Sequence, residues 1–325
     1  MLDKIKNKIY ISLGLTGLIY LAFTIYADYE LVYRSFTQFS LLLIPLVFAL
    51  AFANYVTRFL KWDYYLRLLN IKIKKSDSFT IFMSGLIMSV TPGKMGEVLK
   101  SYLLKQISGE PISKTAPVVI VERITDFVSL IFIALIGAYF FDYGRMIVVM
   151  TGMFFFLVIL VISSRKISLL FIDLVSETKF IRKYAANLKS AYESSYIMLR
   201  AKPLLLMSLL SLLSWFFECF GYYIILINFK VGVSIIWAAF VYCFSTIIGA
   251  VTMLPGGLGV TDGSLTYLVT RHGVPLSTAV ASTFIIRVAT LWFAVFVGII
   301  AVSVFQKKVN VLNKENELQE ILNKK

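Results

Sequence analysis

The sequence predicts an all-α polytopic membrane protein, and three observations lead to this fold class. Of the 325 residues, 59% are hydrophobic and the mean hydropathy is +0.83, which is more apolar surface than a soluble domain can bury. Apolar runs long enough to cross a bilayer recur between short charged loops. Two Pro-Gly motifs, at Pro92 and Pro255, interrupt apolar stretches. We therefore expect about six full spans plus two re-entrant broken-helix hairpins in inverted repeats.

The charge of the chain indicates its orientation. The formal net charge is +14, and lysines and arginines gather in polar stretches such as 61–76 and 164–202. Cytoplasmic loops of membrane proteins are enriched in Lys and Arg, so this explanation is preferred to nucleic-acid binding. We expect a multi-pass protein of the cell membrane with both termini in the cytoplasm and no nucleic-acid partner.

Residue types that usually carry metals or covalent catalysis are scarce. Cys219 and Cys243 lie in apolar segments without the spacing of a metal site or a disulfide framework. His272 is the only histidine, so a histidine-metal cluster or a histidine-based triad is not available. We expect no metal, no cofactor and no catalytic residue, which favours a transporter over an enzyme.

The first half is expected to contain full spans at 9–27, 39–60 and 115–141. At the end of the second span, Arg58 is expected to extend its charge toward the membrane surface. Lys61 is counted there as a cytoplasmic signal, and Trp62, Tyr64 and Tyr65 as an interfacial aromatic belt.

A short apolar segment between the second and third spans predicts the first hairpin. Residues 78–90 are about 13 in number and as a helix reach roughly 20 Å, short of the roughly 30 Å hydrocarbon core. Pro92 and Gly93 then break the helix, and 94–107 leads back toward the basic side. We therefore expect a re-entrant hairpin with its tip at the Pro-Gly motif, buried in protein or in a wet cavity.

The second half is expected to contain a matching broken pair, with Pro255, Gly256 and Gly257 between its arms. The long polar stretch before it predicts helices on the cytoplasmic membrane surface, with a solvated linker helix as the alternative. The first arm is also long enough to span the bilayer by itself. In order, the expected segments are span 146–162, surface helices 164–202, span 204–228, arms 233–253 and 257–271, span 277–305 and a charged tail 306–325.

Four sequence anchors recur in the same order in the two halves, which predicts an internal repeat. They are a Tyr-Tyr pair, a Pro-Gly motif, a Pro-x-Ser motif and an arginine: Tyr64 and Tyr222, Pro92 and Pro255, Pro111 and Pro275, Arg123 and Arg287. A single transmembrane domain, 1–305, would hold repeat one at about 39–141 and repeat two at about 204–305. The charges predict that the first hairpin enters the membrane from the cytoplasmic side and the second from the outside. Such inverted repeats are typical of secondary transporters.

Ionisable residues inside apolar segments are candidate site residues, because a charge at mid-bilayer costs at least about 2.5–3.5 kcal/mol. Arg123 and Arg287 occupy corresponding positions, and a guanidinium can hold a phosphate through two hydrogen bonds. The alternative is a structural pair for each arginine, with Asp126 or Glu97 for the first and with Asp262 or Glu218 for the second. Only one of Glu122 and Arg123 is expected to face a cavity, because adjacent residues point in different directions on a helix.

The tips of the broken helices add further candidates. Lys94 lies at the first tip, either to bind an anion or to pair with a nearby carboxylate. The half-helices that start at each tip would direct unpaired N–H groups at a shared cavity, which suits a phosphate. The predicted substrate-binding residues are Lys94, Arg123, Arg287, Glu97, Gly93, Gly256 and Gly257. The predicted coupling or counter-ion residues are Glu122, Asp126, Glu218 and Asp262.

These motifs resemble those of a known family. They are Pro92–Glu97, Glu122–Asp126, Pro255–Val260 and Arg287, and they are similar to the flippase-like transmembrane region of lysylphosphatidylglycerol synthases and its stand-alone bacterial and archaeal relatives. The resemblance covers about 10–305 and implies translocation of a lipid between leaflets, with polyprenyl phosphates or lipid-linked sugars as cargo in relatives. No soluble aminoacyl-transfer domain follows in this sequence, so lipid aminoacylation is not expected. Asp262 stands where the resemblance implies a glutamate nearer the second Pro-Gly motif.

Three functions follow as expectations. The first is a flippase or scramblase for an anionic or phosphate-linked lipid, with no ATP hydrolysis because the sequence has no Walker loop. The second is a secondary transporter of a small anion, which a closed water-filled cavity would favour. The third is a non-transporting membrane partner of a lipid-modifying or glycosyl-transfer enzyme, docked at 164–202. The sequence leaves the oligomeric state open.

Overall fold

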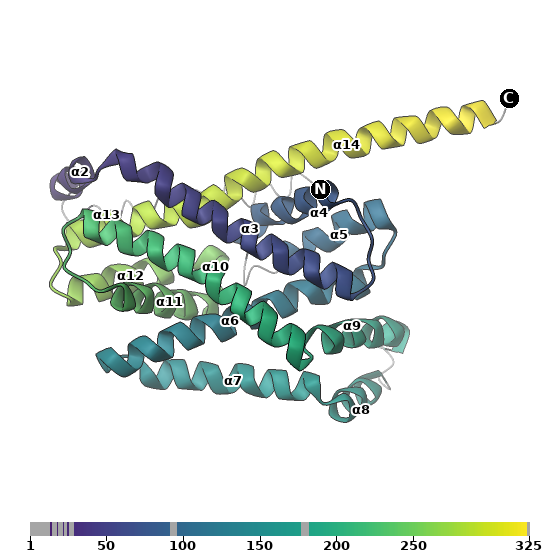
Figure 1. The fold of residues 1–325 in the computed structure, drawn as a ribbon, viewed down its shortest axis with the longest axis horizontal. Coiled ribbons are helices and arrows are strands. Elements are labelled where there is room, and N and C mark those ends of the chain that lie inside the picture. Colours follow the sequence, from purple (N-terminus) through teal and green to yellow (C-terminus); the bar gives the residue numbers. More distant parts are fainter. Residues whose placement is uncertain are drawn as a thin grey trace.

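The computed structural model describes residues 29–91, 96–176 and 182–323 and four isolated positions before residue 29, with side chains as far as residue 310 apart from residue 175. These residues form helices and connecting loops with no strand, which confirms the all-α class (Figure 1). The predicted first span, 9–27, lies almost wholly outside the described residues, and so does the first Pro-Gly tip at 92–95.

Five helices of the described chain are long and apolar enough to cross a membrane. They are Leu41–Leu68, Ile112–Phe141, Arg145–Ser163, Ala201–Asn228 and Leu276–Asn310. In element terms they are η1 (Leu41–Leu43) with α3 (Ile44–Leu68), then α6, α7 and α10, then α13 (Leu276–Arg287), η6 (Val288–Trp292) and α14 (Phe293–Asn323). They correspond to predicted spans two to six, and the chain is therefore a multi-pass membrane protein.

Both Pro-Gly motifs interrupt helices where the sequence predicts. The first broken pair is α4 (Lys75–Gly85) with η2 (Leu86–Val90), followed by α5 (Leu99–Ser108). The second is α11 (Ile235–Val251), then η5 (Pro255–Gly257) and α12 (Val260–Arg271).

The backbone before each proline explains the two breaks. Thr91 has ψ 153° and Leu254 has ψ 146°, because the ring of the following proline pushes its neighbour out of the helical region. Gly256 and Gly257 then take positive φ values of 61° and 65°, which only glycine adopts without strain. Local sequence therefore sets both breaks.

The two broken pairs enter the fold from opposite ends and meet inside it. Because α3 and α10 run in opposite directions, the pair that follows α3 and the pair that follows α10 begin at opposite ends (Figure 1). The segment η2 contacts η5, and a Cβ atom added to Gly256 would lie 3.7 Å from the Cα of Val90. This is the arrangement expected of inverted repeats; the number of full spans and the re-entrant character of the pairs stay predictions.

The remaining helices lie at the ends of the bundle (Figure 1). At one end α2 (Tyr29–Gln38) packs on α13, where the rings of Phe36 and Phe284 meet edge to face. At the other end lie α8 (Arg165–Ser176), η4 (Arg182–Tyr184) and α9 (Ala185–Met198), in the predicted surface segment. Since α9 packs on α6 and buries Met198, the alternative of a solvated linker is wrong for α9. The helix α14 continues past residue 305 and projects from the bundle.

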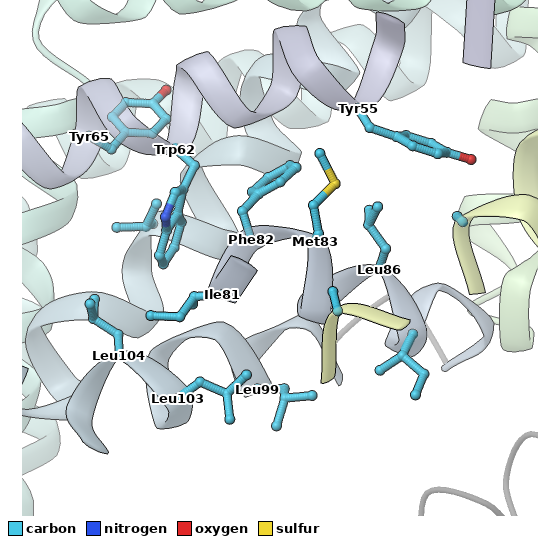
Figure 2. Close-up of a cluster of buried hydrophobic side chains, with 14 of the residues drawn as sticks. Tyr55, Trp62, Tyr65, Ile81, Phe82, Met83, Leu86, Leu99, Leu103 and Leu104 are labelled. Atoms are coloured by element: carbon cyan, nitrogen blue, oxygen red, sulfur yellow. The ribbon is translucent and has the colours of Figure 1, made fainter. Parts of the chain in front are cut away.

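Each broken pair is enclosed in its own hydrophobic cluster. Around the first pair, Figure 2 shows three layers, with side chains of α3 above, those of α4 and η2 between, and those of α5 below. Trp62 and Tyr65 are fully buried in this cluster, so their assignment to an interfacial belt is wrong. The packing is close enough that Gly298 of α14 touches the backbone of Ile87.

Candidate functional site

A cavity of about 860 Å³ lies where the two broken pairs meet. It is lined by Ser89, Thr91 and Val98 of the first pair, by the second tip and by the long helices around them, and its size suits an organic ligand or a lipid headgroup. Its charged lining residues come from both halves of the chain: Arg58, Arg123, Asp126, Glu218 and Arg287. The structure thus brings four of the predicted charged site residues together, and it adds Arg58.

In the first half, one carboxylate lies between two arginines. Glu97, at the start of the arm that leads into α5, accepts a hydrogen bond from Nη2 of Arg123 at 3.1 Å. Its other oxygen lies 3.7 Å from Nη2 of Arg58 on α3. Both arginines also face Asp126, at 3.4 Å from Arg123 and 3.9 Å from Arg58. Glu97 is only 1% exposed, so this network is buried.

Two lysines form a second layer behind these arginines. Lys100 of α5 pairs with Glu122 at 2.5 Å and lies 3.5 Å from Glu97. Lys61 of α3 pairs with Asp126 at 2.7 Å. With all groups ionised, the first half therefore joins four basic and three acidic side chains. Glu218 and the Arg287–Asp262 pair bring the charged groups around the cavity to five basic and five acidic, so the excess of positive charge is local to the first-half wall, where it favours an anion.

The second half uses its charges to hold its own tip. Arg287 pairs through Nε with Asp262 at 2.9 Å, and its Nη2 donates to the backbone carbonyl of Gly256 at 2.6 Å. The other oxygen of Asp262 accepts the N–H of Gly259 at 2.8 Å, at the start of α12. Arg287 and Asp262 therefore fix the second tip to α13.

The expectation of unpaired N–H groups at the second tip is wrong for two of its residues. Gly257 donates to the carbonyl of Leu254 at 2.9 Å, and Leu258 donates to that of Pro255 at 3.1 Å. The helix α12 already has the carboxylate of Asp262 at its N-terminus, where the dipole favours negative charge. Gly256 and Gly257 line the cavity, but the N–H group of Gly257 is directed into the tip.

The predicted residues fall into three groups. The first group lines the cavity: Arg123, Arg287, Asp126, Glu218, Gly256 and Gly257. Within it, Glu218 accepts a hydrogen bond from Tyr242 at 2.7 Å. The second group lies behind the lining and pairs with basic side chains: Glu97, Glu122 and Asp262. The third lies outside the described residues: Gly93 and Lys94. As expected for neighbours on a helix, Arg123 faces the cavity and Glu122 does not.

Sequence reasoning placed Arg58 and Lys61 wrongly. Both were assigned to the membrane surface, whereas Arg58 is 8% exposed and Lys61 is 1% exposed. The helix α3 continues to Leu68, so both residues lie within it rather than at its end. A signal was present, because Arg58, Lys61, Trp62 and Tyr65 recur at the three-to-four spacing of one helix face.

The rim of the cavity is apolar and opens sideways. Several lining residues are also well exposed, among them Met150 at 59%, Phe154 at 61% and Met253 at 63%. Met150 and Phe154 lie in the middle of α7, and Met253 lies beside the second tip. The opening therefore faces the side of the helical bundle, where a bilayer would lie. Within the described residues, no group of three or more His, Cys, Asp or Glu is placed to hold a metal ion.

The chain is similar to a known family of membrane proteins and to archaeal relatives. The family described as lysylphosphatidylglycerol synthase TM region matches residues 9–298. A UPF0104 membrane protein of Methanothermobacter thermautotrophicus is 28% identical over 278 residues, which cover 77% of this chain and 82% of the relative. A UPF0104 membrane protein of Methanocaldococcus jannaschii is 26% identical over 236 residues, which cover 69% of this chain and 95% of the relative.

Proposed function

Since this chain belongs to the family of the lysylphosphatidylglycerol synthase TM region, we propose that it moves a lipid with a phosphate-bearing headgroup between the leaflets of a membrane, as a flippase or scramblase. One observation carries the proposal: the same cavity has charged walls inside and an apolar rim that opens sideways. A lipid needs both features, because its headgroup must leave water while its chains stay in the bilayer.

The charged interior provides the headgroup site. Arg123 and Arg287 come from corresponding positions of the two halves and line one cavity. Guanidinium groups bind phosphate oxygens through short charge-assisted hydrogen bonds, and these are strong in a site that excludes water. Glu218 and Asp126 also line the cavity and would exchange contacts with the arginines, or carry a coupling ion, during transport.

The sideways opening favours a lipid over a small anion. A secondary transporter of a free anion needs a polar path that is closed to the bilayer. Here the lining residues Met150, Phe154 and Met253 are more than half exposed and apolar. Acyl or prenyl chains could remain outside the protein, between α7 and the second tip, while the headgroup crosses.

The opposed broken pairs provide two routes to the site. One pair begins at each end of the bundle, and η2 of the first pair meets η5 of the second beside the cavity. In transporters of this plan, the halves move against each other around a fixed central site. We propose that the headgroup enters past one pair and leaves past the other, driven by an ion gradient or by the lipid gradient itself.

Reconstitution into liposomes tests the proposal. Vesicles would carry a fluorescent phosphatidylglycerol probe or a neutral diacylglycerol probe, and a membrane-impermeant quencher would report the fraction in the outer leaflet. We expect the protein to move the anionic probe and Arg123→Gln to slow it about tenfold or more, since one charge-assisted hydrogen bond contributes about 1.5–3 kcal/mol. Arg145→Gln is the matched control, because Arg145 pairs with Asp142 and is exposed at a turn outside the cavity.

One result would reject lipid movement, and another would reject the proposed headgroup site. In the first case, the anionic probe crosses no faster with protein than in empty vesicles. If instead the Arg123→Gln protein moves the probe as fast as the wild type, Arg123 is not a headgroup ligand. Uptake of a free anion in the first case would favour the small-anion transporter. If neither moves, the remaining candidate is a non-transporting partner of a lipid-modifying or glycosyl-transfer enzyme.

A further inference from the structure

The carboxylate of Glu97 occupies the position that an anion would take between two arginines. It accepts one hydrogen bond from Arg123, at 3.1 Å, whereas its distance of 3.7 Å to Arg58 is too long for another. Among the described residues, Oε1 of Glu97, Nη2 of Arg58 and Nε of Arg123 are buried without a hydrogen-bond partner. The two guanidinium groups therefore attract this carboxylate but are incompletely satisfied by it.

The two arginines can be reached from the cavity, whereas Glu97 does not line it. Arg58 and Arg123 are both lining residues, although the side chain of Arg58 is only 10% exposed. Arg58 makes no hydrogen bond to any described residue, and its charged neighbours Glu97 and Asp126 lie 3.7 Å and 3.9 Å away. A buried guanidinium in this state has donors left for a ligand.

Shape favours phosphate over carboxylate at this position. A carboxylate has two oxygens in one plane, and here it is shared between two guanidinium groups and Lys100. A phosphate group is tetrahedral and offers more acceptor oxygens, so it can accept from two guanidinium groups at once. Nη2 of Arg58 and Nε of Arg123 are buried, so a phosphate that enters from the cavity would reach these donors once Glu97 moves away from the two arginines.

We propose that Arg58 and Arg123 form the phosphate-binding site and that Glu97 is an internal anion that occupies it until a phosphate group displaces it. This inference rests on the proposed function for the source of the phosphate, a lipid headgroup, although a free phosphate would satisfy the same chemistry. After displacement Glu97 retains a partner, because Lys100 lies 3.5 Å from it.

Displacement would loosen one broken pair and leave the other in place. Glu97 belongs to the arm of the first pair, whereas Arg58 and Arg123 belong to α3 and α6. Exchange of Glu97 for a phosphate therefore removes contacts between the arm of the first pair and the long helices. The second pair has Val260 at the position that corresponds to Glu97, and Arg287 fixes its tip through Gly256. Phosphate binding thus acts on the first pair.

The direction in which one substitution changes phosphate affinity separates this competitor role from a purely structural one. If Glu97 were only a counter-ion, its neutralisation would leave buried cations unpaired and disturb the site. If Glu97 competes with phosphate, its neutralisation removes the competitor and raises the apparent affinity for phosphate. The reason is that the apparent affinity is proportional to the fraction of protein molecules in which the site is open. Glu97→Gln is nearly isosteric and removes only the charge.

The experiment measures binding of two probes to the purified full chain in detergent by calorimetry. The probes are inorganic phosphate and a short-chain phosphatidic acid, with a neutral diacylglycerol of the same chains as the blank. We expect Glu97→Gln to bind the phosphate probes about tenfold more tightly and Arg58→Gln about tenfold more weakly. Glu110→Gln and Arg67→Gln should match the wild type, because these residues form surface pairs with Lys114 and Asp63.

A second variant covers the case in which Glu97→Gln fails to fold. Glu97→Asp keeps the charge but shortens the side chain by one methylene, so it reaches the arginines less well and should tighten phosphate binding by a smaller factor. Unchanged or weaker binding in a folded Glu97 variant overturns the inference, and so does unchanged binding in Arg58→Gln. Binding of phosphatidic acid alone assigns the site to a lipid, and equal binding of inorganic phosphate assigns it to free phosphate.

These outcomes are independent of the liposome assay. If no lipid crosses but the Glu97 and Arg58 variants shift phosphate binding as expected, lipid transport is rejected and the internal anion stands. If lipid crosses but the two variants bind phosphate like the wild type, the internal anion is rejected and lipid transport stands.

Discussion

Lys100 joins the first broken pair to α6 through a buried ion pair, and its replacement by methionine should destabilise the fold strongly. Its ammonium lies 2.5 Å from Glu122 and 3.5 Å from Glu97 and is 1% exposed. It also lies 5.0 Å from the ring centre of Trp62 and 4.9 Å from that of Phe82, within the range of cation–π attraction. Lys100→Met preserves most of the side-chain volume and removes the charge.

The cost can be worked out from these contacts. At an effective dielectric constant of about 20, two charges 2.5 Å apart attract by roughly 7 kcal/mol, before the desolvation of both ions is subtracted. The removal of one partner from a buried pair leaves the other charge unpaired and typically costs about 3–5 kcal/mol. Neutralising both, in Lys100→Met with Glu122→Gln, should recover most of this loss, to within about 1–2 kcal/mol of the wild type.

Thermal unfolding of the purified protein in detergent measures the effect. For a chain of 325 residues the melting temperature changes by about 1.5 °C per kcal/mol, so Lys100→Met should unfold about 4–8 °C below the wild type. Lys114→Met is the control, since its ammonium lies 3.0 Å from Glu110 and the two side chains are 29% and 26% exposed. Such a partly exposed pair contributes less than about 1 kcal/mol.

Two outcomes would refute the reasoning. If Lys100→Met unfolds at the same temperature as Lys114→Met, the ion pair with Glu122 contributes no more than a surface pair. If the double variant is no more stable than Lys100→Met alone, Glu122 is not the charge left without a partner.

Two further predictions test how the broken pairs are packed. Gly298→Ala should cost about 1–3 kcal/mol or more, because the new Cβ would lie 2.2 Å from the backbone nitrogen of Ile87. Gly221→Ala, where the nearest atom is 3.9 Å away, should leave the melting temperature almost unchanged. The sulfur atoms of Cys219 of α10 and Cys243 of α11 lie 3.5 Å apart. Diamide, a membrane-permeant oxidant, should therefore join the two residues in a disulfide. The intact mass of the protein should then fall by the mass of two hydrogens. Cysteines that remain fully alkylatable after this treatment would show that α11 is not packed on α10 as described.

The helices and their breaks could be predicted because they depend on local properties. The apolar length of 146–162 predicts a span that the structure has at Arg145–Ser163, and 204–228 predicts one that it has at Ala201–Asn228. A proline removes a backbone donor and restricts the residue before it, so the second break at Pro255 follows from a few residues. The internal repeat, which rests on short anchor motifs, stays a prediction.

The partners of the charged residues could not be predicted in the same way. For Arg123 the sequence left Asp126 and Glu97 as alternatives, and the structure places both carboxylates beside it. The local sequence around Arg58 and Lys61 does not distinguish a side chain that faces lipid headgroups from one that faces buried carboxylates. Because both residues stand at the end of an apolar run, the sequence predicts a position at the membrane surface.

Composition, apolar length and two prolines by themselves determined that this chain is an all-α membrane protein with two broken helix pairs. Only the tertiary structure decided that Arg58 and Lys61 lie inside the bundle, because their counter-ions come from the turn before α5 and from α6, beyond the end of α3 in the sequence. It also decided that the second tip satisfies its own backbone, whereas the arm of the first pair is held at Glu97 by side-chain charges. Helix formation and breakage depend on neighbours in sequence, whereas the pairing of a buried charge depends on which helices the fold brings together.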